Sequence, residues 1–303
     1  MKMTSIRVKI VRRLLLALSR LGIADRIAVN VKTWIGVRAF RVPVLQGLGI
    51  GNLGATEPWM MGIFNRLAPP RTGVFLDVGA NIGQTLLKVR SCWPETPWVG
   101  LEPNPTCLHY LRKLIEANSF TDCNLVPVGL HTEVSLKALE FFYADETDPH
   151  ASLVEHFRPG EKVVSRRLVP TLSYAQIEAF VPRSDVSFVK IDVEGGEKEV
   201  IETLRPVLQV ARPPILMEIL PVYSPDNTWR LDRQRASERV FRELGYQLFR
   251  VEKTAVSDFV GLRRLEEIGV HGRIAWSDYL AVPAERAAEF LKSLGEVTAP
   301  PAA

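Results

Sequence analysis

Two acids and two glycines in the first half of the chain have the spacing of a nucleotide-binding turn. The apolar run that starts at Val74 contains Asp77 and leads into Gly79 and Gly83, and a second apolar run ends in Glu102, 25 residues after Asp77. Glycine lets the backbone turn tightly and approach a ligand, while an acid after the next strand accepts hydrogen bonds from both ribose hydroxyls. The pattern predicts a βαβ unit that binds an adenosine-bearing cofactor.

The same turn is a poor site for a dinucleotide. A pyrophosphate needs Gly-x-Gly-x-x-Gly at a bare helix N-terminus, but here the middle position is Asn81 and the Asp77 carboxylate stands at the entrance. A carboxylate would repel pyrophosphate. S-Adenosylmethionine, which carries an ammonium, a sulfonium and a ribose, fits better, so we predict a methyltransferase rather than a nicotinamide dehydrogenase. A ligand-free α/β protein with a glycine-bearing turn is the simpler alternative.

Strand-like and helix-like segments alternate after residue 70, which predicts an α/β fold with a mostly parallel seven-stranded sheet and helices on both faces. Helices are expected at 82–94, at 104–118, where Asn104 is the N-cap and Pro105 the first helical residue, and at 231–244. A β-rich insertion is expected to contain strands at 139–144 and 162–169. The expected sheet strands are 74–77, 98–101, 123–128, 186–192, 215–220, 247–251 and 276–282.

The 303 residues are enough for one large core and a small appendage. We predict an N-terminal helical extension with a hairpin or loop over the cofactor cleft (1–70), a catalytic domain (71–285), and a last helix end with a disordered tail (286–303). Cys92, Cys107 and Cys123 have no metal-type spacing and are expected to be reduced thiols. No apolar run approaches the length that spans a bilayer, and no clean signal peptide is present, so we expect a cytoplasmic protein, soluble or peripheral to the membrane.

The net charge of +4 conceals a strongly basic N-terminus. Residues 1–41 contain ten Lys or Arg and one acid, Asp25, which leaves the remainder acidic. At helical spacing the apolar residues gather opposite the basic ones, so we predict a basic amphipathic helix. It could contact anionic lipid or a phosphate-rich partner, or it could cap the catalytic domain or a second subunit of a homo-oligomer. The apolar side comprises Ile10, Val11, Leu14, Leu15, Leu18 and Leu21, and the basic side Lys9, Arg12, Arg13 and Arg20.

Three motifs in order, Asp77-Val-Gly-Ala-Asn-Ile-Gly83, Glu102-Pro-Asn-Pro105 and Lys190-Ile-Asp-Val-Glu-Gly-Gly-Glu197, resemble those of the FkbM-type methyltransferases. The likeness covers about residues 57–283. It implies a Rossmann-like class I fold, S-adenosylmethionine as cofactor, and O-methylation of a sugar, a glycan or a natural-product hydroxyl.

The expected cofactor site draws on three consecutive strand ends. Asp77 would serve the amino-acid end of the cofactor, Glu102 the ribose diol, and Val128 and Gly129 the adenine, with close backbone approach at the glycines. The predicted cofactor-binding residues are Asp77, Gly79, Asn81, Gly83, Glu102, Val128 and Gly129.

Catalysis would need a base, because methyl transfer to a hydroxyl is an in-line displacement that also removes a proton. Asp192 and then Glu194 follow a predicted strand, at the sheet edge where ligands bind. Glu194 and Glu197 could instead support the following helix, and Glu218 could pair with Lys190. His150, in a polar loop, is a third candidate base or merely solvated. No ligand spacing indicates a metal, so none is predicted.

Two other classes of function stay open. The basic N-terminus could hold RNA for a nucleic-acid methyltransferase, but it lacks interleaved aromatic residues and the catalytic portion is acidic, which disfavours that reading. A non-catalytic cofactor-binding scaffold is disfavoured by the acids that follow three strands. A small-molecule or glycan acceptor is the preferred partner.

Overall fold

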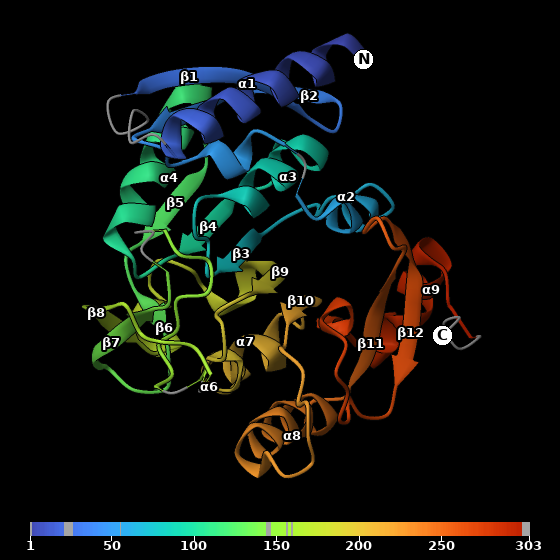
Figure 1. Ribbon diagram of the computed structural model, residues 1–303. Helices are drawn as coiled ribbons and strands as arrows, with labels where there is room; N and C mark the ends of the chain where they lie inside the picture. Colours follow the sequence, from blue (N-terminus) through green and yellow to red (C-terminus); the bar gives the residue numbers. More distant parts are fainter. Residues whose placement is uncertain are drawn as a thin grey trace.

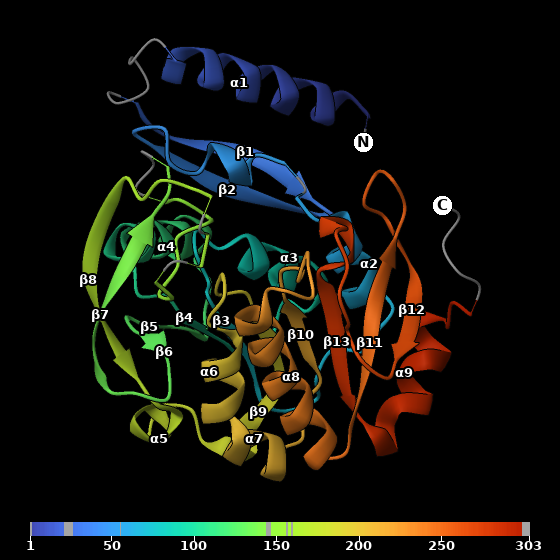
Figure 2. The same ribbon diagram turned by 60° about the horizontal axis from the view of Figure 1, so that its bottom comes forward.

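The computed structural model describes residues 2–20, 27–54, 56–143, 147–155, 157–158 and 160–298. Its centre is one eight-stranded sheet (Figures 1 and 2). In spatial order its strands are β12 (Phe259–Leu265), β11 (Tyr246–Lys253), β13 (Asp278–Pro283), β10 (Ile215–Glu218), β9 (Val186–Ile191), β3 (Val74–Val78), β4 (Trp98–Leu101) and β5 (Cys123–Val126).

The sheet is mostly parallel, as predicted. The five strands from β10 to β5 are paired in parallel, β13 runs antiparallel to β10 and β11, and β12 is antiparallel to β11. All seven predicted strands are present, but the predicted strand count was wrong because β12 was missed. Its sequence, Phe-Val-Gly-Leu-Arg-Arg-Leu, contains a glycine and two arginines and forms a half-exposed edge strand, so its apolar signal is weak.

Each face of the sheet is covered by its own layer of helices. Neighbouring strand residues alternate between the layers: Phe75 and Phe188 belong to one core, and Leu76 and Val189 belong to the other. Figure 2 shows the sheet between these layers. The first core includes side chains of α2 (Pro58–Phe64), α3 (Gln84–Cys92), α4 (Pro105–Asn118) and α9 (Ala287–Leu294), and the second those of α5 (Tyr174–Ile177), α6 (Glu197–Thr203), α7 (Arg205–Val210) and α8 (Thr228–Glu243).

Helix boundaries near the glycine turn follow from local chemistry. The predicted cap of α4 is confirmed: the Asn104 side chain accepts a hydrogen bond from the Thr106 amide, and Pro105 is the first helical residue. Helix α3 begins at Gln84 rather than at 82, because Gly83 adopts a left-handed conformation (φ 80°) that a continuing helix does not allow.

The predicted β-rich insertion forms a separate three-stranded sheet, ordered β6 (Gly129–Leu130), β8 (Ser165–Leu172) and β7 (Ser135–Phe141). The strand predicted over 123–128 therefore ends early, at Val126, and the chain then joins this second sheet. Strand β7 starts four residues before the predicted 139 and ends at Phe141, while Ala144 lies outside the described residues.

A cap made from the N-terminus covers α3 and α4. Helix α1 (Lys2–Arg20) lies within the region predicted as a helical extension. Strand β1 (Ala28–Ile35), which was not predicted, pairs with β2 (Arg38–Leu45) in an antiparallel hairpin (Figure 1). A core of its own joins hairpin side chains such as Phe40 and Val42 to Tyr110 of α4. Leu21 and the tail from residue 299 lie outside the described residues.

Helix α2 precedes the predicted boundary at residue 70, yet Trp59 and Phe64 pack in the core of the main sheet. The three cysteines are free thiols, as predicted. None of the described helices is long and apolar enough to cross a membrane.

Candidate active site

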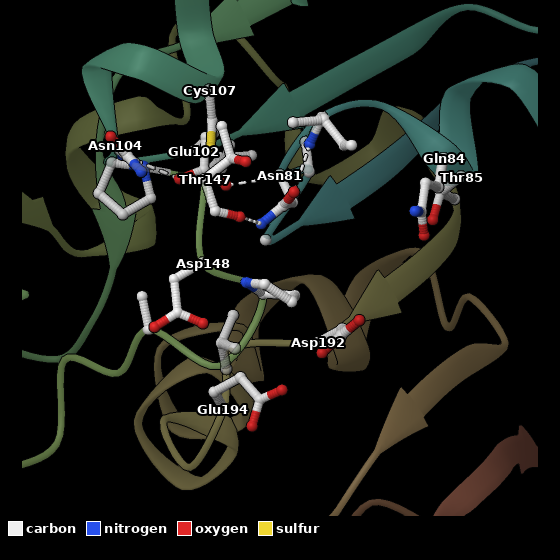
Figure 3. A pocket seen from close by; sticks show the side chains of 18 of the residues that line it. Asn81, Gln84, Thr85, Glu102, Asn104, Cys107, Thr147, Asp148, Asp192 and Glu194 are labelled. Carbon is white, nitrogen blue, oxygen red and sulfur yellow. Dashed lines mark hydrogen bonds between the residues drawn. The ribbon is translucent and has the colours of Figure 1, made fainter. Parts of the chain in front are cut away.

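A cavity of about 890 Å³ opens at the carboxyl ends of β3, β4 and β9. Such a volume suits a cofactor together with an acceptor. Its walls come from the β3–α3 turn, the loop after β2, the insertion and α1. Gln46 to Gly51 line it, so the segment predicted to lie over the cleft does so. Figure 3 shows the side chains of 18 lining residues.

Glu102, in the wall of the cavity, is held by two backbone amides. Its Oε2 accepts a hydrogen bond of 2.7 Å from the Asn81 amide, and its Oε1 one of 2.8 Å from the Asn104 amide (Figure 3). Burial raises the pKa of Glu102 to about 7, against the lowering effect of these two backbone bonds. Because each carboxylate oxygen can accept a further hydrogen bond, Glu102 retains acceptor capacity for a diol.

Asn81, whose amide donates to Glu102, lies in the turn between β3 and α3 and determines its shape. It lies in the left-handed region with φ 44°, and its side-chain Oδ1 accepts a 2.7 Å bond from the Ile82 amide. Asparagine tolerates this conformation because its side chain can satisfy the local backbone. Asn81 also lines the cavity, in agreement with its predicted place in the cofactor site.

The two predicted glycines have different surroundings. Gly79 lines the cavity with φ 84°, and a Cβ there would lie 1.8 Å from the carbonyl oxygen of Asp192, so only glycine allows the turn to approach β9. Gly83 is not among the lining residues. A Cβ there would lie 2.8 Å from Leu111 and from Leu114, which indicates that its smallness serves the packing of α3 on α4 rather than ligand approach.

Asp77 lies beneath the cavity rather than in its wall. Its side chain is fully buried, and its Oδ1 is 3.8 Å from Nζ of Lys190. Burial raises the pKa of Asp77 to about 6, while Lys190 opposes this shift. The Asp77 carboxylate could therefore act on the amino-acid end of the cofactor only indirectly, through Lys190 or the neighbouring backbone. The role of Asp77 in cofactor binding stays a prediction.

Lys190 links the two halves of the cavity and was not predicted as a site residue. Its Nζ is 3.1 Å from Oδ2 of Asp192 and donates to the carbonyl oxygen of Gly79 at 3.3 Å. Burial disfavours its charge, but Asp192 and Asp77 outweigh burial and raise the pKa of Lys190 above its usual value. The sequence did contain a signal for Lys190: a lysine between Val189 and Ile191 in a buried strand needs partners for its charge. The ion pair between Lys190 and Glu218, which was one of the expected alternatives, is not formed among the described residues.

Asp192 and Glu194 both line the cavity, at the end of β9 (Figure 3). Glu194 has φ 50°, its carbonyl oxygen accepts a 2.6 Å bond from the Ser152 hydroxyl, and its Oε2 is 2.6 Å from Nη2 of Arg158. Burial, and then the nearby Asp192, raise the pKa of Glu194 to about 8, while Arg158 lowers it. The side chain of Asp192 is about one-third exposed and is the more accessible of the two.

A third acid adjoins this pair. One carboxylate oxygen from each of Asp192, Glu194 and Glu218 can be chosen so that all lie within 4.8 Å of one another, a spacing that a divalent cation could bridge. Burial, followed by Asp192, raises the pKa of Glu218 to about 10. The sequence motifs gave no indication of this cluster because Glu218 comes from the neighbouring strand, β10.

His150 is not among the residues that line the cavity. Its side chain is 39% exposed, its ring lies 5.1 Å from that of Tyr143, and its Nδ1 is 3.5 Å from Oδ1 of Asp148. The neighbouring Asp148 does line the cavity, but it is held by the backbone amides of Phe142, Tyr143 and His150. The role of His150 as a base stays a prediction.

Val128 and Gly129, the predicted adenine neighbours, line the cavity beside Leu153 of the insertion. A Cβ on Gly129 would lie 2.6 Å from Cδ1 of Leu153, so the insertion loop packs closely on β6 at this side of the cavity. Sequence reasoning also missed Glu57 and Arg12 as lining residues. Glu57 pairs with the buried Lys88 at 2.7 Å. Burial alone would raise the pKa of Glu57, but the attraction of Lys88 outweighs burial and lowers it.

A doubly wound sheet with this strand order, a glycine turn and a buried glutamate after the second strand defines the class I methyltransferase type of fold. Residues 77–248 match the Methyltransferase FkbM domain. The chain belongs to this family, whose methyl donor is S-adenosylmethionine. The predicted cofactor is confirmed, and the spare acceptor capacity of Glu102 beside Gly79 fits the ribose.

Other similarities are more distant. "Methyltransferase 1" of Beauveria bassiana (strain ARSEF 2860) is 24% identical over 148 residues, which are 45% of this chain. The chain spans only 59% of the length of this curated relative. A putative O-methyltransferase from Klebsiella pneumoniae has a TM-score of 0.42 with 12% identity, covering 76% of this chain and 80% of that one. M. jannaschii TYW2 in complex with AdoMet has a TM-score of 0.39 with 11% identity, covering 84% and 86%.

Proposed function

We propose that the protein O-methylates a hydroxyl group of a sugar, a glycan or a related natural product. The observation that carries the proposal is the position of Asp192, an accessible carboxylate in the same cavity as the ribose-binding candidate Glu102. A carboxylate is a suitable base for a hydroxyl, and polar side chains in the wall, such as Gln84 and Thr85, can bind an acceptor with several hydroxyl groups.

S-Adenosylmethionine supplies the methyl group: the new O–CH₃ bond forms as the S–CH₃ bond breaks. Asp192 accepts the proton that the acceptor hydroxyl loses. Lys190 holds the Asp192 carboxylate in place by its 3.1 Å contact. Glu194, held by Arg158, is placed to orient a second hydroxyl of the acceptor.

Residues that hold the cofactor form a separate group. Glu102 would accept hydrogen bonds from the ribose hydroxyls, and Val128 and Gly129 would flank the adenine. Asn81 keeps Glu102 in place through its amide. The insertion contributes Leu153 and Asp148 to the wall of the cavity.

The test is transfer of a labelled methyl group from S-adenosylmethionine to a panel of saccharides and hydroxylated natural products, with NMR identification of the methylated atom. An O-methyl product that depends on Asp192 supports the proposal. Methylation of nitrogen or carbon, or of RNA in place of these acceptors, would replace it with another acceptor class.

A further inference from the structure

The side of α1 that faces away from the hairpin is exposed. Its residues divide into three stripes at helical spacing. Val8, Val11 and Leu15 pack on the cap core, with Leu15 only 7% exposed. Ile10 and Leu14, four residues apart, form a second stripe and are 52% and 58% exposed. The apolar side predicted from the sequence is therefore only partly buried: one part packs on the cap core and the other is exposed.

The charged residues of α1 and of the hairpin β1–β2 are all basic. Helix α1 and strands β1 and β2 together contain nine Lys or Arg and no Asp or Glu. Arg13, next to the stripe on the helix, is exposed, as are Lys32 and Arg38 on the hairpin. In Figure 2, α1 lies on the outside of the hairpin, away from the main sheet.

We propose that the stripe of Ile10 and Leu14, flanked by Arg13, docks on the surface of an anionic lipid bilayer. The helix would lie in the plane of the interface, with the aliphatic side chains among the acyl chains and the cations at the head groups. The helix is not apolar enough to cross a membrane, which fits a surface position.

Two other occupants suit the stripe less well. A second copy of the chain would bring two basic surfaces together, and two aliphatic side chains cover far less than the roughly 800 Å² per partner of a stable interface. An RNA would be attracted by the charge, but it has no use for an aliphatic stripe at the outermost part of the helix.

The third stripe of α1 borders the active site. Arg12 and Leu16 line the catalytic cavity, and both are exposed, so they lie at its rim. Both lie nearly opposite Ile10 and Leu14, about 160° around the helix. Docking would therefore leave the rim of the cavity on the side of α1 that faces away from the bilayer.

The test is flotation of the full-length protein with vesicles of phosphatidylcholine alone or with about one-third phosphatidylglycerol. We expect binding only to the anionic vesicles, decreasing as salt is raised, because exposed charges are screened. Ile10→Ser with Leu14→Ser should weaken binding about tenfold or more, because two half-buried aliphatic contacts are lost. Arg13→Glu should weaken it as well.

Matched controls come from other exposed surfaces. Leu136→Ser with Leu168→Ser removes an aliphatic pair from the insertion that is even more exposed, and Arg239→Glu reverses an exposed positive charge on α8. Both should bind vesicles as the wild type does. Calorimetric binding of S-adenosylmethionine checks folding in every variant.

Three outcomes would overturn the proposal: no flotation of the wild type at low salt, equal flotation of the Ile10/Leu14 variant, or a dimer in sedimentation that this variant dissociates. The assay involves no methyl transfer. A protein that floats but methylates no hydroxyl would contradict the proposed function alone.

Discussion

The two halves of the cavity are held by different kinds of interaction. On the cofactor side, backbone amides fix Glu102 within a short stretch of chain, and a glycine turn completes the site. On the acceptor side, Asp192 and Glu194 are held by the side chains of Lys190, Arg158 and Ser152, two of which belong to the insertion. A backbone-held site tolerates changes of sequence around it, whereas a side-chain-held site can change its specificity by single substitutions.

The strongest test of this difference is Asp192→Asn. The amide keeps the size of the side chain but cannot accept the proton, so kcat should fall by about 10²- to 10⁴-fold. The Kd for S-adenosylmethionine, measured by calorimetry, should stay within about threefold. Asp226→Asn, an exposed acid near the start of α8, is the matched control. A variant with wild-type kcat would remove Asp192 from catalysis and leave Glu194 as the remaining lining carboxylate of β9.

How well each half could be predicted from the sequence follows the same division. Asp77, Gly79 and Glu102 lie in one contiguous βαβ unit, so their spacing alone indicated a cofactor turn. The Glu194 partner Arg158 and the Asp192 neighbour Glu218 come from segments that only the fold brings together, and no spacing relates them. Asp77 and Gly83 show the limit of motifs: both match the pattern, yet one is buried beneath the cavity and the other packs against α4.

The strand predictions failed for a related reason. Strand β12 carries two arginines in a half-exposed edge, and β1 exposes most of its side chains, so neither shows the apolar run of the central strands. The central strands Trp98–Leu101 and Val74–Val78 are buried on both faces and could be located closely.

The cofactor side should respond to Glu102→Gln by weaker binding rather than by slower chemistry. The neutral amide offers one acceptor oxygen in place of two, so ribose hydroxyls and the Asn81 and Asn104 amides compete for it. We expect the calorimetric Kd to rise about 10- to 100-fold, equivalent to about 1–3 kcal/mol. Glu116→Gln, an exposed glutamate of α4, controls for the loss of charge. An unchanged Kd would exclude Glu102 as the ribose ligand.

The pH dependence of cofactor binding sharpens the same assignment. Burial raises the pKa of Glu102 to about 7 in the free protein, and ribose hydroxyls donate to the ionised form. Binding should therefore tighten as pH rises through 7, with Kd about tenfold lower at pH 8 than at pH 6. The opposite slope, or the same slope in Glu102→Gln, would assign the titration to another group, such as Asp77.

The smallest expected effect lies where the two halves meet, at Gly129. Its missing Cβ leaves room for Leu153 of the insertion, and Leu153 also lines the cavity. In Gly129→Ala the Leu153 side chain must rotate, which should lower the free energy of unfolding by about 1 kcal/mol and raise the cofactor Kd about fivefold. Gly54→Ala, where a Cβ meets no atom within 4 Å, is the control for both measurements. If stability falls while the Kd is unchanged, Gly129 serves only the packing of the insertion, and the backbone-held half of the cavity ends at Glu102.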